Sequence, residues 1–287
     1  NIVTGGGAEV GEPLGMHMDV DMVTFTGSTV TGRRFLRYAA DSNMKKVVLE
    51  LGGKNPCIVL DDAEDLDSVA AQVVSAAFWN MGENCSAGSR LIVHEKIKGA
   101  LIERIIANAR DWNTGDPLDP TNQLGAMIDK GHFAKVEGYL KLGRESGATL
   151  LLGGESRDGC YIEPTIFDGV SNADPLAQEE IFGPVLSVIT VASYDEAIQV
   201  ANDTEYGLAA SVFTANAKRA LRAAQAVRAG TVTVNCFGEG DITTPFGGYK
   251  QSGFGGRDNS VHAHDQYTEL KTIWVDLSDD AVDGSVD

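Results

Sequence analysis

One cysteine lies among small and polar residues, directly after a segment with the pattern of a helix. Cys85 follows the residues GEN (82–84) and precedes SAG (86–88). A thiolate attacks carbonyl carbons well, although an ordinary cysteine is mostly protonated at neutral pH. The small neighbours leave room beside the sulfur, and their backbone N–H groups could hold the oxyanion that attack creates. Taken alone, such a cysteine is more commonly a small buried hydrophobe, so Cys85 is a candidate nucleophile that needs support from other residues.

That support begins with a carboxylate at the end of an apolar strand. Glu50 opens the motif ELGGK (50–54), in which two glycines form a turn directly after the strand. An apolar setting raises the pKa of a carboxyl group toward the pH at which the protein works. Such a group can take a proton from water as a general base. A surface carboxylate that caps a turn is the alternative reading of Glu50.

A turn between glycines follows another predicted strand and opens a helix. Residues 27–32 read GSTVTG. The first N–H groups of a helix and its positive end attract phosphate groups. The spacing lacks the full G-x-G-x-x-G pattern of dinucleotide-binding proteins. On these residues alone, an ordinary strand-to-helix turn is the favoured interpretation over a phosphate site.

Four motifs occur in one order along the chain: ELGGK at 50–54, GxxC at 82–85, EEIFGP at 179–184 and PFGGYKQSG at 245–253. Together they resemble the motif set of the aldehyde dehydrogenase superfamily, and the resemblance extends from residue 1 to about residue 276. It implies that Cys85 attacks a small-molecule aldehyde to give a thiohemiacetal, which passes a hydride to a nicotinamide. The implied cofactor is NAD, with NADP as the other possibility. Glu50 is then expected to activate the water that hydrolyses the thioester.

The resemblance also implies where the cofactor binds. The turn at 27–32 matches the pyrophosphate side of the cleft, and two earlier glycines match positions that let the adenosine part approach. In EEIFGP, the second glutamate matches a residue that binds ribose hydroxyls, and the phenylalanine matches one that supports the nicotinamide. A solvated acidic pair before a core phenylalanine is the alternative there. The predicted cofactor-binding residues are Gly7, Gly11, Gly27, Ser28, Gly32, Leu51, Glu180 and Phe182.

Aromatic residues near the cysteine match positions that line the aldehyde tunnel in relatives, and Trp79 and Phe246 are predicted to bind substrate. Large aromatic residues are also ordinary core residues. Asp241 is the third predicted substrate residue, because a carboxylate at the mouth of the tunnel would attract a cationic or amide-bearing aldehyde. The segment 240–274 looks most like the branch that oxidises γ-aminobutyraldehyde derivatives such as the γ-glutamylated one. Acidity of a surface loop is the alternative explanation of Asp241.

Short strands and helices alternate along the chain, which predicts an α/β fold with parallel strands. We expect a remnant of a dinucleotide-binding domain over 1–52, a second α/β unit (the catalytic domain) over 53–255, and a return segment with an oligomerisation strand and an acidic tail over 256–287. The last strand is expected at 269–275. Strands are also predicted at 22–25, 47–51, 57–60, 91–93, 149–152, 162–167, 185–191, 211–213 and 231–235, and helices at 12–18, 33–40, 67–80, 99–111, 132–145, 194–202 and 217–227.

Composition excludes several classes of function. The 287 residues carry a formal net charge of −18, which repels nucleic acid. The sequence shows no apolar run of the ~20 residues that span a bilayer, so no membrane partner is expected. Four cysteines without regular spacing fit reduced thiols and a cytoplasmic location. The histidines lack metal-ligand spacing, and no metal site is predicted.

Two alternatives to a dehydrogenase remain open from the sequence. Compared with the pattern of the family that the chain resembles, the sequence lacks the N-terminal part, which in relatives includes an asparagine that helps to hold the oxyanion. The chain could therefore be a truncated, inactive or slow remnant that acts as a subunit-interaction module through 269–275, the segment that also suggests a homo-oligomer. A thiol hydrolase or acyltransferase that uses Cys85 without a nicotinamide is the other alternative. Such sites usually need a histidine, and no motif ties a histidine to Cys85.

Overall fold

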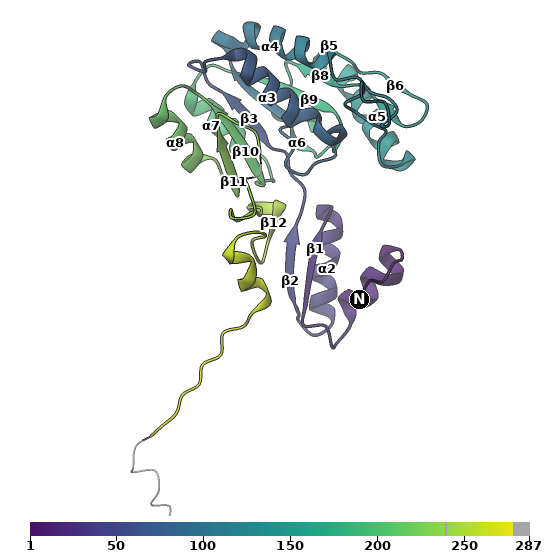
Figure 1. The fold of residues 1–287 in the computed structure, drawn as a ribbon, viewed down its shortest axis with the longest axis vertical. Coiled ribbons are helices and arrows are strands. Elements are labelled where there is room, and N and C mark those ends of the chain that lie inside the picture. The colour runs from purple at the N-terminus through teal and green to yellow at the C-terminus, as the bar shows by residue number, and fades with distance from the viewer. Residues whose placement is uncertain (239, 278–287) are drawn as a thin grey trace, which may run out of the picture.

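The structure is a computed structural model that describes residues 1–238 and 240–277. Figure 1 shows a larger body built on one sheet, a smaller body with β1, β2 and α2, and an extended C-terminal segment that leads away from both. The larger sheet has the strand order β11-β10-β3-β4-β9-β8-β5 and the smaller one β1-β2-β12. All pairings of the larger sheet are parallel except that of β5 with β8. The predicted α/β class with parallel strands is confirmed.

The central strands of the larger sheet are buried on both faces, whereas its edge strands β5 and β11 are only partly buried. In β3 and β4, Cys57 and Val93 contribute to one apolar cluster with the helices α3 and α4, whereas Ile58 and Ile92 contribute to another with α7 and α8. Successive side chains of a strand point to opposite faces, so continuous apolar runs are what a sheet with helices on both sides requires. The strands of this sheet are β3 (Pro56–Val59), β4 (Arg90–His94), β5 (Thr149–Leu152), β8 (Thr165–Asp168), β9 (Val185–Val191), β10 (Ala209–Phe213) and β11 (Thr231–Val234), and β6 (Ser156–Arg157) and β7 (Tyr161–Ile162) form a separate hairpin.

Six of the eight α-helices in the described residues begin at a polar residue that accepts a hydrogen bond from the first turn; α1 and α6 do not. Ser28 accepts from Thr31 at the start of α2, and Asp129 accepts from His132 at the start of α5. Such caps satisfy backbone N–H groups that have no partner inside the helix. The helices are α1 (Glu12–Met16), α2 (Thr29–Asp41), α3 (Leu66–Phe78), α4 (Glu95–Arg110), α5 (Lys130–Glu145), α6 (Pro175–Gln178), α7 (Tyr194–Asn202) and α8 (Ala217–Ala226).

The smaller sheet joins distant parts of the sequence. Strand β1 (Met22–Thr26) pairs in parallel with β2 (Lys46–Glu50), and β12 (Gly253–Phe254) pairs antiparallel with β2. Helix α2 packs against this sheet through Phe35 and Ala39. Thr26 and Glu50 are register partners at the carboxyl ends of β1 and β2. The turn at 27–32 and the ELGGK motif therefore leave the sheet side by side.

The structure differs from the sequence expectations at both ends of the chain. The helix predicted over 12–18 ends at Met16. The strand predicted over 269–275 was wrong for the single chain, where this segment has no regular secondary structure and Leu270 and Trp274 are fully exposed. A strand exists only with a hydrogen-bonded neighbour, which this segment does not have among the described residues. The last residues of the predicted acidic tail, 278–287, lie outside the described residues.

Pairing of β12 with β2 crosses the predicted boundary between 1–52 and 53–255. That division of the chain stays a prediction.

None of the helices in the described ranges is long and apolar enough to cross a membrane.

Candidate active site

A cavity of about 620 Å³ lies where the two sheets face each other. Thr26 and Glu50 reach it from the carboxyl ends of β1 and β2, and Cys85 and Phe182 reach it from the loops before β4 and β9. Crevices at strand ends are the usual ligand sites of parallel sheets. Its lining residues are Thr26, Gly27, Ser28, Glu50, Leu51, Gly52, Trp79, Asn80, Glu83, Asn84, Cys85, His132, Lys135, Glu180 and Phe182.

The loop that bears Cys85 is held by the side chain of Asn55. The Asn55 amide donates to the Cys85 carbonyl oxygen at 2.8 Å and to the Ala87 carbonyl oxygen at 2.9 Å. Its own oxygen accepts from the Ala209 N–H at 2.9 Å. Asn55 is buried, and its bonds to Ala87 and Ala209 are shielded from water, whereas the one to Cys85 is partly shielded. The backbone around the sulfur is thereby anchored to the larger sheet, while Cys85 itself stays half-buried on the cavity.

Each glycine of ELGGK makes room for one residue of the cavity. A Cβ atom on Gly53 would lie 2.3 Å from the Cys85 carbonyl oxygen, and one on Gly52 would lie 2.3 Å from Glu180 Oε2. Both separations are far below van der Waals contact. Glycine is the residue that allows such close backbone approach. The two glycines after β2 therefore lie against the cysteine loop and against the EEIFGP motif at the same time.

Glu50 has the surroundings that a buried general base needs. Its side chain is 6 % exposed, and Oε2 has no hydrogen-bond partner in the described part of the protein. Burial, and next the nearby negative charge of Asp258, raise the pKa of Glu50 to about 8, while Arg257 acts in the opposite direction. A carboxyl group with this pKa exchanges its proton near neutral pH. The structure thus brings Glu50 and Cys85 to one cavity.

Glu180 is fixed on the opposite side of the turn. Its Oε1 accepts from the Gly53 N–H at 2.9 Å, and its backbone carbonyl accepts from Lys135 Nζ at 2.9 Å. Burial raises the pKa of Glu180, whereas the Gly53 bond and the charges of Lys135 and Lys54 lower it. One carboxylate oxygen is occupied by the protein, which leaves Oε2 to accept from a ligand. This geometry suits hydroxyl groups such as those of a ribose.

Not all of the predicted site residues are brought to this cavity. Trp79, half exposed, lines it, but Asp241 and Phe246 are not among the lining residues. The Asp241 carboxylate accepts from the Thr243 N–H and hydroxyl within its own exposed loop, and those bonds lower its pKa. Phe246 forms a backbone bridge with Asp258. Binding of substrate by Asp241 and Phe246 therefore stays a prediction.

Among the predicted cofactor residues, Gly27, Ser28, Leu51, Glu180 and Phe182 line the cavity, whereas Gly7, Gly11 and Gly32 do not. Gly32 is buried against Leu51, where a Cβ atom would lie 2.6 Å from the Leu51 side chain. Gly32 thus allows α2 to pack closely on the end of strand β2. Gly7 and Gly11 are the first and last residues of a short π-helix that precedes α1.

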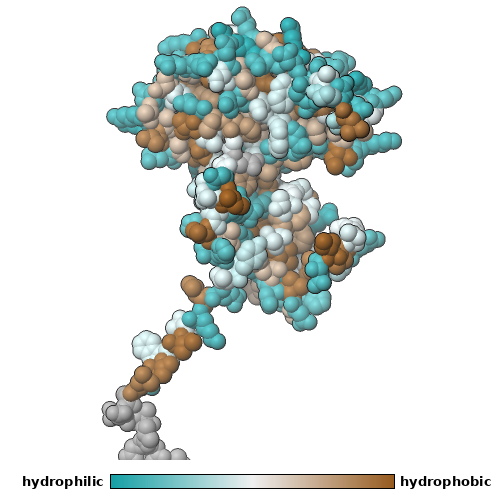
Figure 2. Space-filling model, in the orientation of Figure 1, coloured by the Kyte–Doolittle hydropathy of each residue, from teal (hydrophilic) through white to brown (hydrophobic). Residues whose placement is uncertain are grey.

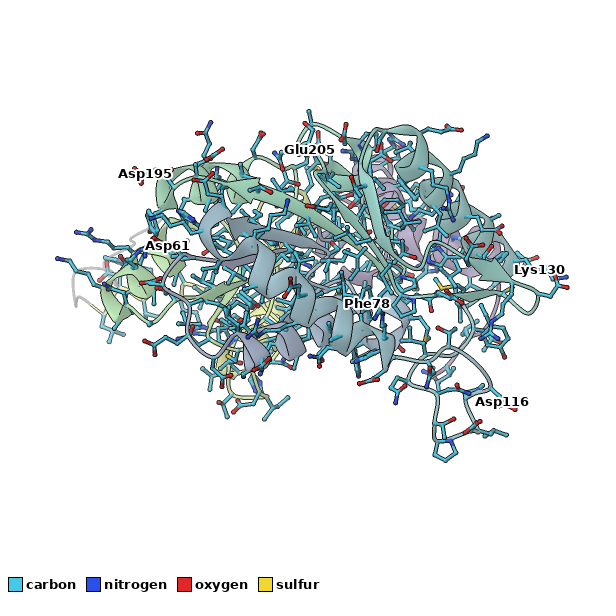
Figure 3. The ribbon with its side chains drawn as sticks, turned by 90° about the horizontal axis from the view of Figure 1, so that it is seen from above. Asp61, Phe78, Asp116, Lys130, Asp195 and Glu205 are labelled. Atoms are coloured by element: carbon cyan, nitrogen blue, oxygen red, sulfur yellow. The ribbon has the colours of Figure 1, made fainter. Side chains whose placement is uncertain are left out.

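Sequence reasoning missed Asn55 and gave no site role to His132 and Lys135, all of which contribute to the cavity or to its walls. A polar residue between a glycine turn and a buried strand was the available signal for Asn55. Phe78, the last residue of α3, is fully buried and packs on Trp112; it is one of the labelled residues in Figure 3.

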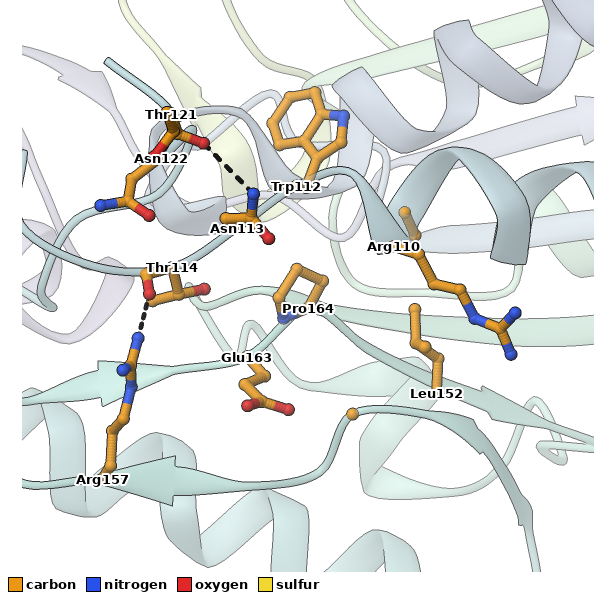
Figure 4. A pocket seen from close by; sticks show the side chains of 12 residues that line it. Arg110, Trp112, Asn113, Thr114, Thr121, Asn122, Leu152, Arg157, Glu163 and Pro164 are labelled. Atoms are coloured by element: carbon orange, nitrogen blue, oxygen red, sulfur yellow. Dashed lines mark hydrogen bonds between the residues drawn. The ribbon is translucent and has the colours of Figure 1, made fainter. Parts of the chain in front are cut away.

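A second cavity, of about 500 Å³, has no lining residue in common with the first. Figure 4 shows Arg157 donating to the Thr114 carbonyl and Asn113 donating to the Thr121 carbonyl across it. It contains no cysteine among its lining residues. Among the described residues, no group of three or more histidine, cysteine or acidic side chains could hold a metal ion.

The residues of the first cavity fit a dinucleotide. The volume is within the range of about 300–1,000 Å³ usual for cofactor sites. The start of the 13-residue helix α2 lies at one end, with Ser28 as its cap, and can hold phosphate groups. Glu180 lines the same cavity as this helix start and Cys85. Leu51 and Phe182 supply apolar surface for a flat ring.

Comparison with known proteins gives one consistent family. The model of the aldehyde dehydrogenase family matches residues 1–273. The chain is 63% identical over 278 residues to the aminoacetaldehyde dehydrogenase of Pseudomonas aeruginosa, covering 97% of the chain and 56% of the relative. It is 46% identical over 277 residues to the NADP/NAD-dependent aldehyde dehydrogenase PuuC of Escherichia coli, covering 96% and 56%. The solved structure of an indole-3-acetaldehyde dehydrogenase in complex with NAD+ superposes with a TM-score of 0.93 and 52% identity, covering 95% of the chain and 56% of that structure. The chain thus spans about half the length of these relatives.

Proposed function

The chain belongs to the aldehyde dehydrogenase family, and we propose that it takes part in the oxidation of an aldehyde to a carboxylic acid with NAD or NADP. The observation that carries this proposal is the meeting of Cys85 and the buried Glu50 on one cavity. The relatives named for NAD+ and for NADP/NAD support the cofactor class.

In the proposed reaction, the Cys85 thiolate forms a carbon–sulfur bond with the aldehyde carbon. The electron pair of the carbonyl moves to oxygen. The N–H groups of Ser86, Ala87 and Gly88 in the cysteine loop, which the sequence suggested as holders of this charge, already donate to Asn84 and to the Ala76 carbonyl oxygen. Asn55 keeps this loop in place through the Cys85 and Ala87 carbonyls. When bound, the nicotinamide cofactor supplies a hydride acceptor for the former aldehyde carbon. A thioester on Cys85 remains.

Glu50 completes the proposed cycle. Its ionised carboxylate takes a proton from water, and the hydroxide equivalent adds to the thioester carbon. Collapse breaks the carbon–sulfur bond, releases the carboxylic acid and restores the thiolate. A pKa of about 8 makes Glu50 a better base than an ordinary carboxylate, although part of it is protonated at pH 7.

Two substitutions test these roles. Cys85→Ala should abolish both NADH formation and the hydrolysis of a nitrophenyl ester. Glu50→Gln should spare acylation and slow hydrolysis of the thioester, so that rapid-mixing experiments show one burst of NADH per site followed by slow turnover. Steady turnover of Glu50→Gln at the wild-type rate would remove Glu50 from the mechanism. Absence of NADH formation by the wild-type protein with any short aldehyde would favour the inactive-remnant reading.

The proposed substrate class is a small aldehyde with an amino or amide group. The support is the 63% identical relative named for aminoacetaldehyde and the net charge of −18, which attracts cations. A γ-glutamylated aminoaldehyde is the second candidate. Values of kcat/KM for aminoacetaldehyde, its N-acetyl form and propanal test the class, and equal values for all three would contradict a role for the amino group.

We further propose self-association through the segment 268–277. This segment exposes Leu270, Ile273, Trp274 and Val275, and Figure 2 shows apolar residues along its length. Exposed apolar strand-forming segments commonly pair with another chain. Light scattering should give more than one chain per particle, and Ile273→Asp with Trp274→Asp should lower the mass. A cytoplasmic location and the division into 1–52, 53–255 and 256–287 stay predictions.

A further inference from the structure

A glutamate and a histidine connect three segments that meet at the cavity. Glu83 lies two residues before Cys85, His132 lies in the first turn of α5, and Phe182 lies in the turn before β9. All three line the cavity. The side chains of Glu83 and His132 are 9% and 15% exposed, so both are largely withdrawn from water.

The contacts run from the cysteine loop to the carbonyl of Phe182. Glu83 Oε1 accepts from the Ile128 N–H at 3.0 Å and lies 3.6 Å from His132 Nε2. His132 Nε2 lies 2.5 Å from the Phe182 carbonyl oxygen. A carbonyl oxygen only accepts hydrogen bonds, so Nε2 must carry the hydrogen. The carboxylate beside that N–H favours the same orientation of the imidazole ring.

Phe182 needs such support because of its backbone conformation. Its φ angle is +59°, in the left-handed region that is costly for a bulky residue. The next residue is pressed against the cysteine loop, since a Cβ atom on Gly82 would lie 2.3 Å from the Gly183 carbonyl oxygen. A strained conformation persists only where its surroundings hold it. The hydrogen bond from His132 acts on the carbonyl of the strained residue itself.

We propose that Glu83 and His132 are positioning residues that hold the Phe182 turn against the cysteine loop, so that the Phe182 ring stays placed to support the nicotinamide. This inference rests on the proposed function, because it assigns Phe182 to the cofactor site. Glu83 accepts from the Ile128 N–H and places its carboxylate 3.6 Å from His132 Nε2, and His132 donates to the Phe182 carbonyl. Neither residue takes part in the bonds that form or break.

The test compares His132→Leu with His132→Gln. The Nε2 atom of glutamine lies the same number of bonds from Cα as that of histidine and donates an N–H, whereas leucine cannot. We expect His132→Leu to weaken NAD binding, measured by calorimetry, about tenfold. Ester hydrolysis without cofactor should fall much less, and His132→Gln should recover most of the lost affinity. Unchanged NAD affinity in His132→Leu, or no recovery in His132→Gln, would overturn the proposal.

A double-mutant cycle separates positioning from direct contact with the cofactor. Glycine adopts positive φ angles without strain, so in Phe182→Gly the turn no longer needs the hydrogen bond. The effect of His132→Leu should then shrink in the Phe182→Gly background, whereas equal effects in both backgrounds would contradict positioning through Phe182. If wild-type protein hydrolyses the ester but binds no NAD, the proposed function fails together with this inference. If wild type binds NAD and His132→Leu binds it equally, the positioning role alone fails.

Discussion

The pH dependence of thioester hydrolysis is the most informative consequence of the geometry around Glu50. Burial, and then the charge of Asp258, raise its pKa to about 8. Roughly a tenth of the carboxyl groups are then ionised at pH 7 and roughly nine tenths at pH 9. A step that needs the carboxylate as base should therefore become about tenfold faster between these two pH values and level off above them.

Two neighbouring charges should move the midpoint of this pH profile in opposite directions when each is removed. Asp258 raises the pKa of Glu50 and Arg257 lowers it. Asp258→Asn should therefore move the midpoint of the profile to lower pH and speed hydrolysis at pH 7. Arg257→Gln should move the midpoint to higher pH and slow hydrolysis at pH 7. Both changes leave Glu50 in place, so a general loss of activity does not imitate them.

The assay follows the slow phase after the burst with a nitrophenyl ester, across pH 6 to 10 in steps. Glu50→Gln is the control for hydrolysis by free hydroxide, which rises with pH without a plateau. A wild-type profile with its midpoint near the ordinary carboxyl value, or shifts of both variants in the same direction, would refute the electrostatic account of Glu50.

Three further predictions concern stability. Gly53→Ala should destabilise the protein by about 1–3 kcal/mol and reduce ester hydrolysis, because its Cβ would meet the Cys85 carbonyl oxygen. The control is Gly99→Ala, where a Cβ meets nothing within 4 Å; in urea titrations it should be neutral or stabilising by up to about 1 kcal/mol. Equal losses of stability in the two variants would contradict the argument that Gly53 allows close approach of the cysteine loop. Asn55→Leu should cost about 3 kcal/mol in the same titrations, since two buried backbone groups and one partly buried group lose their partner. A loss below about 1 kcal/mol would count against the anchoring role of Asn55. The folded protein keeps the Glu50 proton to higher pH than the unfolded chain does. The free energy of unfolding of wild type should therefore fall, relative to that of Glu50→Gln, as pH rises from about 4.5 to about 8. A constant difference between the two free energies across that window would show that the pKa of Glu50 is not raised.

The sequence predicted the class of fold because helices and strands buried on both faces leave clear patterns. The strands at 149–152 and 185–191 and the helix at 194–202 have the predicted bounds. It did not predict β12, a two-residue strand whose only reason is its pairing with β2 about 200 positions earlier. Nor did it predict that 269–275 stays without a strand, since an apolar pattern does not say whether a pairing partner is present.

For the site, the motifs indicated which residues face one cavity but not what holds them there. Cys85, Glu50, Glu180 and Trp79 line the cavity as expected, although their chemical roles stay predictions. Asn55 was missed because its three hydrogen bonds reach segments far away in sequence. Asp241 lies outside the lining of this cavity, and its carboxylate accepts two hydrogen bonds from Thr243, so its role in substrate binding stays a prediction.

Mass spectrometry of a trapped intermediate tests the central claim most directly. Glu50→Gln is mixed with aldehyde and NAD, quenched in acid and digested. The account predicts an acyl group, two hydrogens lighter than the aldehyde adduct, on the peptide that contains Cys85, and no such group in Cys85→Ala. An acyl group found instead on Cys57, Cys160 or Cys236, or persistence of the adduct in Cys85→Ala, would contradict the account.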